Sequence, residues 1–260
     1  MSKSRYFAGI DVGTSYIKAV IIDEKNEITG SFIERSGADL KKSIQAAFKG
    51  AIAAADISRD AIKHITATGF GRNNVPCADS VKTEISAHAK GAYHYFSKKS
   101  TIIDIGGQDT KIIKIDAKGI TIGFKMNRKC AAGTGAFLEE IAYKLNIPMD
   151  ELNKLATKSS KDTALSSFCT VFASTEILTR IKEGEKIEDM VKSAFESVAR
   201  RVIEMDTLDN TIVMTGGVVT YNDIILKILS NHIGKKILMP SEPQLCGAMG
   251  AALFAREAKD

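Results

Sequence analysis

Residues 5–28, RYFAGIDVGTSYIKAVIIDEKNEI, and residues 100–120, STIIDIGGQDTKIIKIDAKGI, are two copies of one pattern. Placing Asp11 on Asp104 gives an offset of 104 − 11 = 93 residues. The same offset places Gly13 on Gly106, Lys18 on Lys111 and Asp23 on Asp116. The chain therefore contains an internal repeat.

Each copy predicts a β-hairpin. In the first copy, the apolar runs 7–12 and 17–22 are separated by a short turn that contains Gly13. A third strand and helices follow, which is the pattern of an α/β unit with a mixed sheet. We expect an N-terminal domain over residues 1–96, to which the last helix can return. A C-terminal domain over residues 97–260 would carry the cysteine-containing helices.

The two turns have the composition of phosphate-binding loops. Glycine lets the backbone approach a ligand closely, and amides, hydroxyls and a lysine can hold a phosphate. Two such units facing one another would place both turns beside one cleft, where Asp11 and Asp104 would hold Mg²⁺ through waters and position the attacking water. The residues expected around the phosphates are Gly13, Thr14, Ser15 and Lys18 from the first copy and Gly106, Gly107 and Gln108 from the second.

Between the copies we predict a helix over 39–55, a strand over 62–68 and a helix over 83–93. Glu84 begins the last of these. It is a candidate for orienting a catalytic water, or it is a first-turn carboxylate favoured by the helix dipole. The spacing alone favours neither interpretation.

The C-terminal half contains two further glycine-bearing turns. We predict a long helix over 187–208, a strand over 211–215 and a helix over 219–229. Gly216 and Gly217 follow the strand, and Gly247 and Gly250 begin a last helix. These four glycines would line the adenosine side of a nucleotide, although Gly247 and Gly250 also suit close packing of helices.

Two cysteines precede helical patterns. Cys130 lies in residues 126–145, MNRKCAAGTGAFLEEIAYKL, and Cys169 lies in residues 166–181, SSFCTVFASTEILTRI. We expect both at helix N-termini, where free amides and the helix dipole favour a thiolate or a metal cluster that carries thiolates. Cys77 and Cys246 match no ligand motif and are interpreted as structural, and the four histidines show no metal-ligand spacing.

The composition indicates a soluble, cytoplasmic protein. No apolar run approaches the length of a membrane span, and residues 1–13 lack the features of a signal peptide. Disulfides are not expected in a reducing cytoplasm. The net charge of +5 comes from scattered Lys and Arg, without the basic stripe that nucleic-acid binding requires.

Four motifs resemble the phosphate and adenosine motifs of the actin, Hsp70 and sugar-kinase superfamily. They are DVGTS at 11–15, DIGGQD at 104–109, TGGV at 215–218 and GAMGAA at 247–252. The resemblance implies a duplicated RNase H-like fold, with two domains around a nucleotide cleft. KCAAGTG at 129–135 and SFCTVFA at 167–173 further resemble the signatures of the activators of 2-hydroxyacyl-CoA dehydratases, or archerases, which are relatives of the benzoyl-CoA reductase ATPase subunits.

This second resemblance implies a mechanism. Members of the family are homodimers that share one 4Fe-4S cluster per dimer, which two cysteines from each protomer hold; here these would be Cys130 and Cys169. ATP hydrolysis changes the angle between protomers, and a low-potential electron passes to an iron-sulfur partner enzyme. The resemblance also implies ferredoxin or flavodoxin as electron donor.

The identity of the partner is open at this point. Arg128, Ala136 and Ser174 depart from the usual family pattern, and all three lie beside the expected cluster ligands. The partner could be a 2-hydroxyacyl-CoA dehydratase, a benzoyl-CoA reductase or a double-cubane cluster protein. Two other functions remain, an amino-sugar kinase of the same superfamily and a non-catalytic regulator that binds nucleotide.

Overall fold

The structure is a computed structural model that describes residues 5–167 and 169–259. Phe168 of the second cysteine motif and residues 1–4 of the start lie outside the described residues. The chain divides into two compact units. The first contains the residues up to Lys99, Ile115–Ile122 and the segment from Gln244 onward, and the second contains Ser100–Lys114 and Gly123–Pro243.

The first unit is built on a mixed five-stranded sheet with the order β3-β2-β1-β4-β5. β1 pairs antiparallel with β2 and parallel with β4. The strands are β1 (Tyr6–Val12), β2 (Tyr16–Ile22), β3 (Ile28–Arg35), β4 (Ile62–Thr68) and β5 (Ser80–Val81). The helices are α1 (Leu40–Ala55), α2 (Glu84–Phe96) and α9 (Cys246–Glu257).

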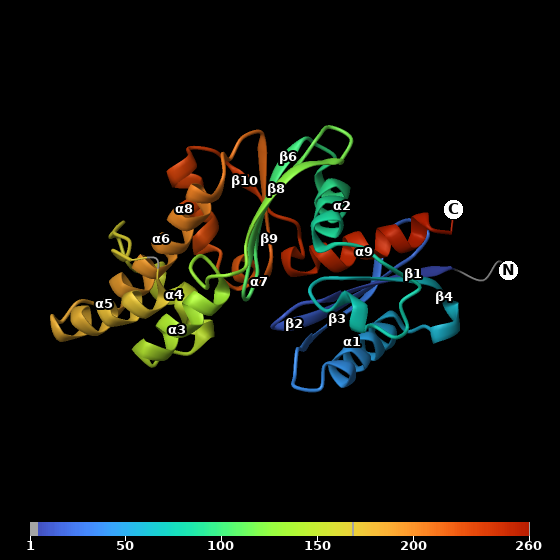
Figure 1. Cartoon of the computed structure of the whole chain (residues 1–260), viewed down its shortest axis with the longest axis horizontal. Helices are drawn as coiled ribbons and strands as arrows, with labels where there is room; N and C mark the ends of the chain where they lie inside the picture. Colours follow the sequence, from blue (N-terminus) through green and yellow to red (C-terminus); the bar gives the residue numbers. More distant parts are fainter. Residues whose placement is uncertain (1–4, 168, 260) are drawn as a thin grey trace. The chain divides into compact units, whose positions relative to one another are not determined.

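Alternating side chains of this sheet enter two different cores, because successive residues of a strand point to opposite faces. On β2, Ile17 and Ile21 pack in the core that α1 covers, whereas Val20 and Ile22 pack in the core that α9 covers. Figure 1 shows α1 along this sheet. Gly9 permits the close approach of α9, since a Cβ at this position would lie 2.0 Å from the carbonyl oxygen of Ala248.

The second unit is built on a sheet with the order β10-β9-β6-β7-β8. Its main core gathers around the long helix α6, from which Phe195, Val198 and Val202 are fully buried. The strands are β6 (Ser100–Ile105), β7 (Thr110–Ile115), β8 (Thr121–Asn127), β9 (Thr211–Thr215) and β10 (Ile237–Leu238). The helices are α3 (Gly135–Leu145), α4 (Leu152–Ala156), α5 (Thr170–Lys182), α6 (Ile187–Met205), α7 (Gly217–Tyr221) and α8 (Ile224–Ile233).

The repeat in the sequence is also a repeat in hydrogen bonding. The Asp23 carboxylate accepts from the amides of Lys25 and Glu27 at 2.8 and 2.9 Å, and the Asp116 carboxylate accepts from those of Lys118 and Ile120 at the same distances. The acceptor and both donors keep the offset of 93 residues. The turn between β2 and β3 and the turn between β7 and β8 are therefore closed by the same hydrogen bonds.

The predicted elements of the first unit are confirmed. Asp39 and Thr83 each precede a helix and accept a backbone hydrogen bond as N-caps, from Lys42 and Ser86 respectively. The predicted strand 62–68 agrees with β4.

Two predicted helices in the second unit have different bounds in the structure. The long helix ends at Met205, where Asp206 takes an extended conformation, and does not continue to Leu208. The single helix predicted over 219–229 is two helices, α7 and α8. Asn222 leaves the helical region between them, and the side chain of Asn153 accepts a hydrogen bond from the amide of Ile224 at 3.1 Å.

None of the helices within residues 5–167 and 169–259 has the length and apolar character that crossing a membrane requires.

Candidate functional site

In the first unit, a buried aspartate and a lysine form an ion pair where β1 ends. Asp11 and Lys18 are directly opposite each other in the antiparallel register of β1 and β2. Lys18 Nζ lies 3.1 Å from Asp11 Oδ2. Asp11 is only 5 % exposed, so the lysine compensates the cost of burying its charge.

In the second unit, the same pair occurs with additional partners. Lys111 Nζ lies 3.1 Å from Asp104 Oδ2 and 2.6 Å from Asp109 Oδ1. The hydroxyl of Thr215 donates to Asp104 Oδ1 at 3.1 Å. Asp104 and Lys111 are both buried, and Asp109 stands at the turn between their strands.

Each aspartate is backed by a glycine with a positive φ angle. Gly69 follows β4 with φ +88°, and a Cβ there would lie 2.4 Å from Asp11 Oδ1. Gly216 follows β9 with φ +101°, and a Cβ there would lie 2.8 Å from Asp104 Oδ1. β4 and β9 are the parallel neighbours of β1 and β6, so the two glycines are structurally equivalent.

Gly69 and the preceding Thr68 are site residues that the sequence analysis missed. The available signal was the dipeptide Thr-Gly at the end of a strand, at 68–69 and at 215–216. Its offset is 215 − 68 = 147 residues and not 93, because the second copy has 147 − 93 = 54 more residues before this strand. Both candidate cysteines lie between β8 and β9, the stretch in which these additional residues occur.

The turn residues lie next to the carboxylates. Gly13 N donates to the carbonyl of Tyr16 at 3.1 Å, and Gly106 N donates to that of Asp109 at 2.9 Å, so the offset of 93 residues holds here too. Both loops reach the surface. Thr14 and Gln108 are exposed, whereas Gly13, Ser15, Gly106 and Gly107 are half-buried.

The glycines expected on the adenosine side occupy different surroundings. Gly217 begins α7, directly after Gly216. A Cβ at Gly247 would lie 3.2 Å from Asp11 Oδ2 and 2.8 Å from His88 Nε2, so this glycine belongs to the surroundings of Asp11. A Cβ at Gly250 would lie 1.8 Å from the carbonyl oxygen of Ala87, so Gly250 permits close packing of α9 on α2.

Glu84 is the first residue of α2 and is half-buried. His88 follows one turn later and is buried. Because residues four positions apart share a helix face, Glu84 lies on the same face as His88, whose ring nitrogen approaches Gly247.

The expectation that Cys130 lies at a helix N-terminus is wrong. α3 begins at Gly135, and Cys130 lies in the preceding loop, where its side chain is exposed. Gly133 has φ +81° and Thr134 is extended, so the helix cannot continue back to the cysteine. The side-chain nitrogen Nδ2 of Asn127 anchors the loop by donating to the carbonyls of Cys130 and Ala132, at 3.1 and 2.9 Å.

Cys169 does lie at a helix N-terminus. It is the N-cap residue of α5, its side chain is exposed, and its backbone amide donates to Ser167 Oγ at 3.1 Å. Of the residues that depart from the family pattern, Arg128 is exposed, Ala136 lies in the first turn of α3, and Ser174 is buried with its hydroxyl 3.3 Å from Glu140 Oε1.

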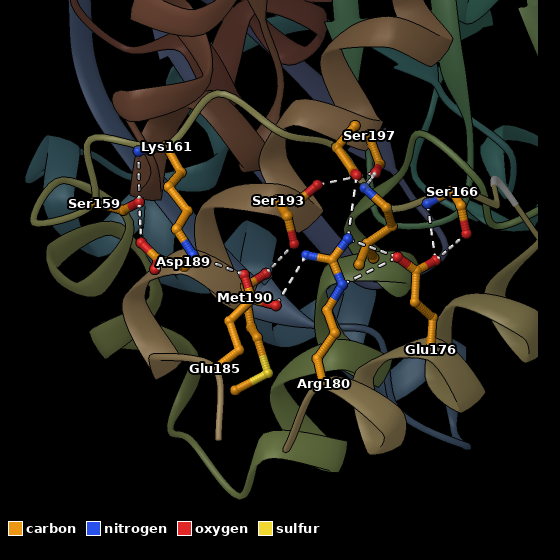
Figure 2. Close-up of polar contacts among 12 residues, drawn as sticks. Ser159, Lys161, Ser166, Glu176, Arg180, Glu185, Asp189, Met190, Ser193 and Ser197 are labelled. Atoms are coloured by element: carbon orange, nitrogen blue, oxygen red, sulfur yellow. Dashed lines mark hydrogen bonds and ion pairs between the residues drawn. The ribbon is translucent and has the colours of Figure 1, made fainter. Parts of the chain in front are cut away.

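The chain before Cys169 is held by an ionic clamp, which we define as Glu176, Arg180 and Ser166 (Figure 2). Glu176 Oε2 accepts from the amide and the hydroxyl of Ser166 at 2.8 and 2.5 Å. Arg180 Nη2 lies 2.6 Å from Glu176 Oε1. Burial opposes ionisation of Glu176, but the hydrogen bonds from Ser166 and Arg180 outweigh it and hold the pKa of this carboxyl below its ordinary value.

The other two cysteines have different environments. Cys246 is buried in the first unit, and Cys77 is half-buried, where burial raises the pKa of its thiol. Within residues 5–167 and 169–259, no group of three or more His, Cys, Asp or Glu side chains is arranged to hold a metal ion.

The model of the BadF/BadG/BcrA/BcrD ATPase family matches residues 8–255. The chain is a member of that family. Among solved structures, component A of the (R)-2-hydroxyglutaryl-CoA dehydratase of Acidaminococcus fermentans matches with a TM-score of 0.94 and 36 % identity, over 98 % of this chain and 99 % of that one. The activator of the 2-hydroxyisocaproyl-CoA dehydratase of Clostridium difficile, with bound ADPNP, matches with a TM-score of 0.91 and 37 % identity. The match covers 97 % of this chain and 95 % of that one.

A glucokinase of the ROK family from Streptomyces griseus matches with a TM-score of 0.59 and 15 % identity, over 97 % of this chain and 99 % of that one. At this identity the likeness concerns the fold alone. The expected fold class, a duplicated α/β fold of the actin, Hsp70 and sugar-kinase type, is confirmed, and so is the resemblance to the dehydratase activators. As a member of this ATPase family, the chain shares its fold with an activator that binds an ATP analogue.

Proposed function

We propose that this protein is an ATP-hydrolysing activator that passes a low-potential electron to an iron-sulfur enzyme. The observation that carries the proposal is the combination of two features. The Asp–Lys turn is duplicated, and two exposed cysteines lie between β8 and β9, in the part of the second copy that is longer than its counterpart between β3 and β4. The duplicated turns suit a nucleotide, and the exposed cysteines suit a metal cluster.

For the nucleotide, we propose that the turns after β1 and β6 bind the phosphates of ATP. Their amides, with Thr14, Ser15, Lys18 and Gln108, are donors to anionic oxygen. Asp11 and Asp104 would hold Mg²⁺ through waters, and Glu84 or Gln108 would orient the attacking water. Gly216, Gly217 and Gly247 would leave room for the nucleoside, whereas the contact of Gly250 with α2 supports packing for that residue.

For the cluster, the residues of this chain fit half of a cubane. A 4Fe-4S cluster usually takes four thiolates. Cys130 and Cys169 are both free and exposed, so two copies of the chain related by a twofold axis would complete the set. Val171 and Phe172, which directly follow Cys169 on α5, are 72 % and 66 % exposed, and such apolar side chains support a subunit contact at this end.

When bound, the cluster supplies one-electron transfer. Cys130 and Cys169 would hold it. The free amides at the start of α5 favour negative charge at Cys169, and Asn127 fixes the backbone of Cys130. ATP hydrolysis would change the arrangement of the two protomers, and ferredoxin or flavodoxin would supply the electron.

The partner is proposed to be an iron-sulfur enzyme that acts on an acyl-CoA, of the 2-hydroxyacyl-CoA dehydratase or benzoyl-CoA reductase class, or a double-cubane protein. The dehydratase class is supported by the two similar solved structures, a component and an activator of 2-hydroxyacyl-CoA dehydratases. A cytoplasmic location would suit the oxygen sensitivity of such a cluster.

Two variants test the two halves of this proposal independently. Iron, acid-labile sulfide and ATPase activity are measured on protein purified without oxygen. We expect about four iron and four sulfide per dimer in the unaltered protein, with a reducible cubane EPR signal. Asp104→Asn should lower the ATPase rate by about 100-fold or more and keep its iron, since it removes charge only at the magnesium site.

Cys130→Ser should show the reverse, with its iron lost and nucleotide binding unchanged. Full iron content in Cys130→Ser would overturn the ligand assignment. Protein that takes up no iron after reconstitution but phosphorylates an amino sugar would establish the kinase function instead.

A further inference from the structure

The start of α3 depends on the phosphate loop for its cap. The first amides of a helix lack partners within the helix, and a side chain usually accepts from them. Thr134, the N-cap residue of α3, makes no such side-chain bond. The amide of Gly135 instead donates to the carbonyl of Gly106 at 2.9 Å, and that of Ala136 donates to the carbonyl of Gly107 at 2.7 Å.

A third bond joins the same two segments. Thr110 begins β7 directly after the loop, and its hydroxyl donates to the carbonyl of Gly133 at 2.5 Å. The Thr110 side chain is fully buried. Loop residues 106–110 are therefore tied to residues 133–136 by three hydrogen bonds.

From Gly133, the connection continues to Cys130. Asn127 donates from one amide nitrogen to the carbonyls of Cys130 and Ala132, and Thr134 bonds back to the carbonyl of Ala131 through both its amide and its hydroxyl. The carbonyls of Cys130, Ala131 and Ala132 therefore all accept hydrogen bonds from residues within 127–134. These bonds join the backbone near Gly133 to that of Cys130.

The geometry of the peptide group gives this connection a direction. A trans peptide is planar, with its C=O and the following N–H pointing to opposite sides. No cis peptide occurs among the described residues. The carbonyls of Gly106 and Gly107 point to α3, so the amides of Gly107 and Gln108 point away from it, towards the side proposed for phosphate. If either peptide rotates, its hydrogen bond to α3 and the direction of its amide on the opposite side change together.

The first copy of the repeat provides an internal comparison. There the carbonyl of Gly13, the equivalent of Gly106, accepts from Ser36 Oγ at 2.9 Å, and the carbonyl of Ser15 accepts from Ser36 N at 2.9 Å. Ser36 directly follows β3. The loop of the first copy is thus bound to the end of its own third strand, whereas in the second copy the equivalent carbonyl binds the segment that follows Cys130.

We propose that Thr110 is a positioning residue that couples phosphate binding at Gly106 and Gly107 to the position of Cys130. This rests on the proposed function, because it takes the loop as a nucleotide site and Cys130 as a cluster ligand. Phosphate bound to the loop amides fixes the two peptides, these fix the start of α3, and Thr110 fixes Gly133. The loop of Cys130 is then more ordered with nucleotide than without it.

The test uses iron-free, full-length protein, so that it does not depend on electron transfer. Alkylation of each cysteine by iodoacetamide is followed by peptide mass spectrometry, with and without ADPNP and Mg²⁺, and ADPNP binding is measured by calorimetry. Because allosteric coupling typically amounts to about fivefold or more, we expect ADPNP to slow alkylation of Cys130 by at least about fivefold, and to leave Cys77 unchanged.

Thr110→Val keeps the shape of the side chain and removes the hydroxyl. We expect this variant to bind ADPNP, but ADPNP should no longer slow the alkylation of its Cys130 by more than a small part of the original factor. Thr101→Val is the matched control, because Thr101 is also fully buried in the same sheet and also donates to a backbone carbonyl, that of Asp209, but at the other end of β6. It should keep the full effect.

Thr110→Ser and Gly135→Ala keep the proposal testable if Thr110→Val does not fold. Thr110→Ser retains the donor and should retain the coupling. A Cβ at Gly135 would lie 3.3 Å from both the carbonyl oxygen of Gly106 and Gly107 Cα, so Gly135→Ala should push the segments apart and weaken the coupling.

The outcomes separate this proposal from the proposed function. The coupling is overturned if ADPNP binds without changing the alkylation rate of Cys130. It is also overturned if ADPNP slows this alkylation as much in Thr110→Val as in the unaltered protein. Either result leaves the proposed function standing. Protein that binds no ADPNP overturns both.

Discussion

At the scale of single residues, the two buried ion pairs differ in how much the loss of their lysine should destabilise the protein. Lys18 is 16 % exposed at its side chain and has Asp11 as a partner, whereas Lys111 is 4 % exposed and lies between Asp104 and Asp109. An uncompensated charge costs more as burial increases. The second turn is therefore the less tolerant of the two to loss of its lysine.

The glycine behind Asp11 leads to a sharper prediction. Gly69→Ala places a methyl 2.4 Å from Asp11 Oδ1 in a backbone conformation with φ +88°. We expect the left-handed conformation to cost about 1–2 kcal/mol and the overpacking about 1–3 kcal/mol more. Displacement of the carboxylate should lower the ATPase rate by about 100-fold.

Gly234→Ala is the control, because Gly234 has φ +69° but a Cβ there would meet nothing within 4 Å. It should show only the conformational cost, with an unchanged ATPase rate. Chemical denaturation and steady-state ATPase assays measure both variants. Equal effects in the two would contradict the role given to Gly69.

At the scale of elements, the segment before α5 is fastened to two helices. The clamp holds Ser166 to α5, and the amide of Leu165 donates to Ser197 Oγ of α6 at 2.9 Å. Earlier in the same segment, Lys161 and Ser159 bind Asp189 near the start of α6 (Figure 2). The segment that leads towards Cys169 is thus held by hydrogen bonds at Ser159, Leu165 and Ser166.

The ionic clamp predicts that the free energy of unfolding depends on pH. The pKa of Glu176 is lowered in the folded state, so its stabilisation is complete above the ordinary glutamate range and is lost as the pH falls through the lowered pKa. Glu176→Gln should cost about 2 kcal/mol at pH 7, since hydrogen bonds to a charged group are lost. The difference from the unaltered protein should shrink as the pH falls below the ordinary glutamate pKa of about 4.3, and should disappear only below the lowered pKa of Glu176.

Thermal unfolding across this pH range measures the difference. Glu151→Gln is the control, because Glu151 pairs with Lys154 at the surface and such pairs contribute little. If the unaltered protein and Glu176→Gln differed equally at all pH values, the carboxylate would not be the source of the stabilisation.

At the scale of the whole molecule, the first unit depends on residues from the far end of the chain. Met249 and Leu253 of α9 pack with Phe7 and Val20 of the first two strands. Deletion of residues 244–260 should expose that face of the sheet and unfold the first unit. Hydrogen exchange should then become fast in β1 and β2, whereas β6 and β9 stay protected.

Deletion of residues 258–260 alone, which follow α9, should leave exchange unchanged. Protection of β1 in the longer deletion would show that α9 is dispensable for the first unit.

The sequence was most informative where local chemistry repeats. The hairpins and the glycine turns follow from residues at one fixed offset, and the structure repeats the hydrogen bonds of Gly13 and Gly106 and those of Asp23 and Asp116. The Asp–Lys ion pairs were not predicted, because Lys18 was expected to contact phosphate. The helices over 39–55 and 83–93 were predicted from the spacing of their own apolar residues, which is local in the chain. The structure adds that Asp39 and Thr83 cap them.

Features set by distant residues were not predictable. The break between α7 and α8 depends on Asn153, about 70 residues away in the chain. The start of α3 was placed too early, because the small residues 131–136 show no periodicity before Phe137, and the bonds that define the helix start come from Gly106 and Gly107. Gly69 was missed because its relation to Asp11 comes from strand pairing.

The packing of α9 on β1 also has a consequence for the order of events during synthesis. β1 to β5 leave the ribosome first, yet one face of their sheet stays without its apolar cover until residues 246–257 have been made. Contacts between segments so distant in sequence form slowly, and an uncovered apolar sheet is prone to aggregation. The second unit, whose described core lies within residues 103–237, can fold earlier. The half of the protein that is translated first is thus the half that matures last, and it is where a chaperone would have the longest time to act.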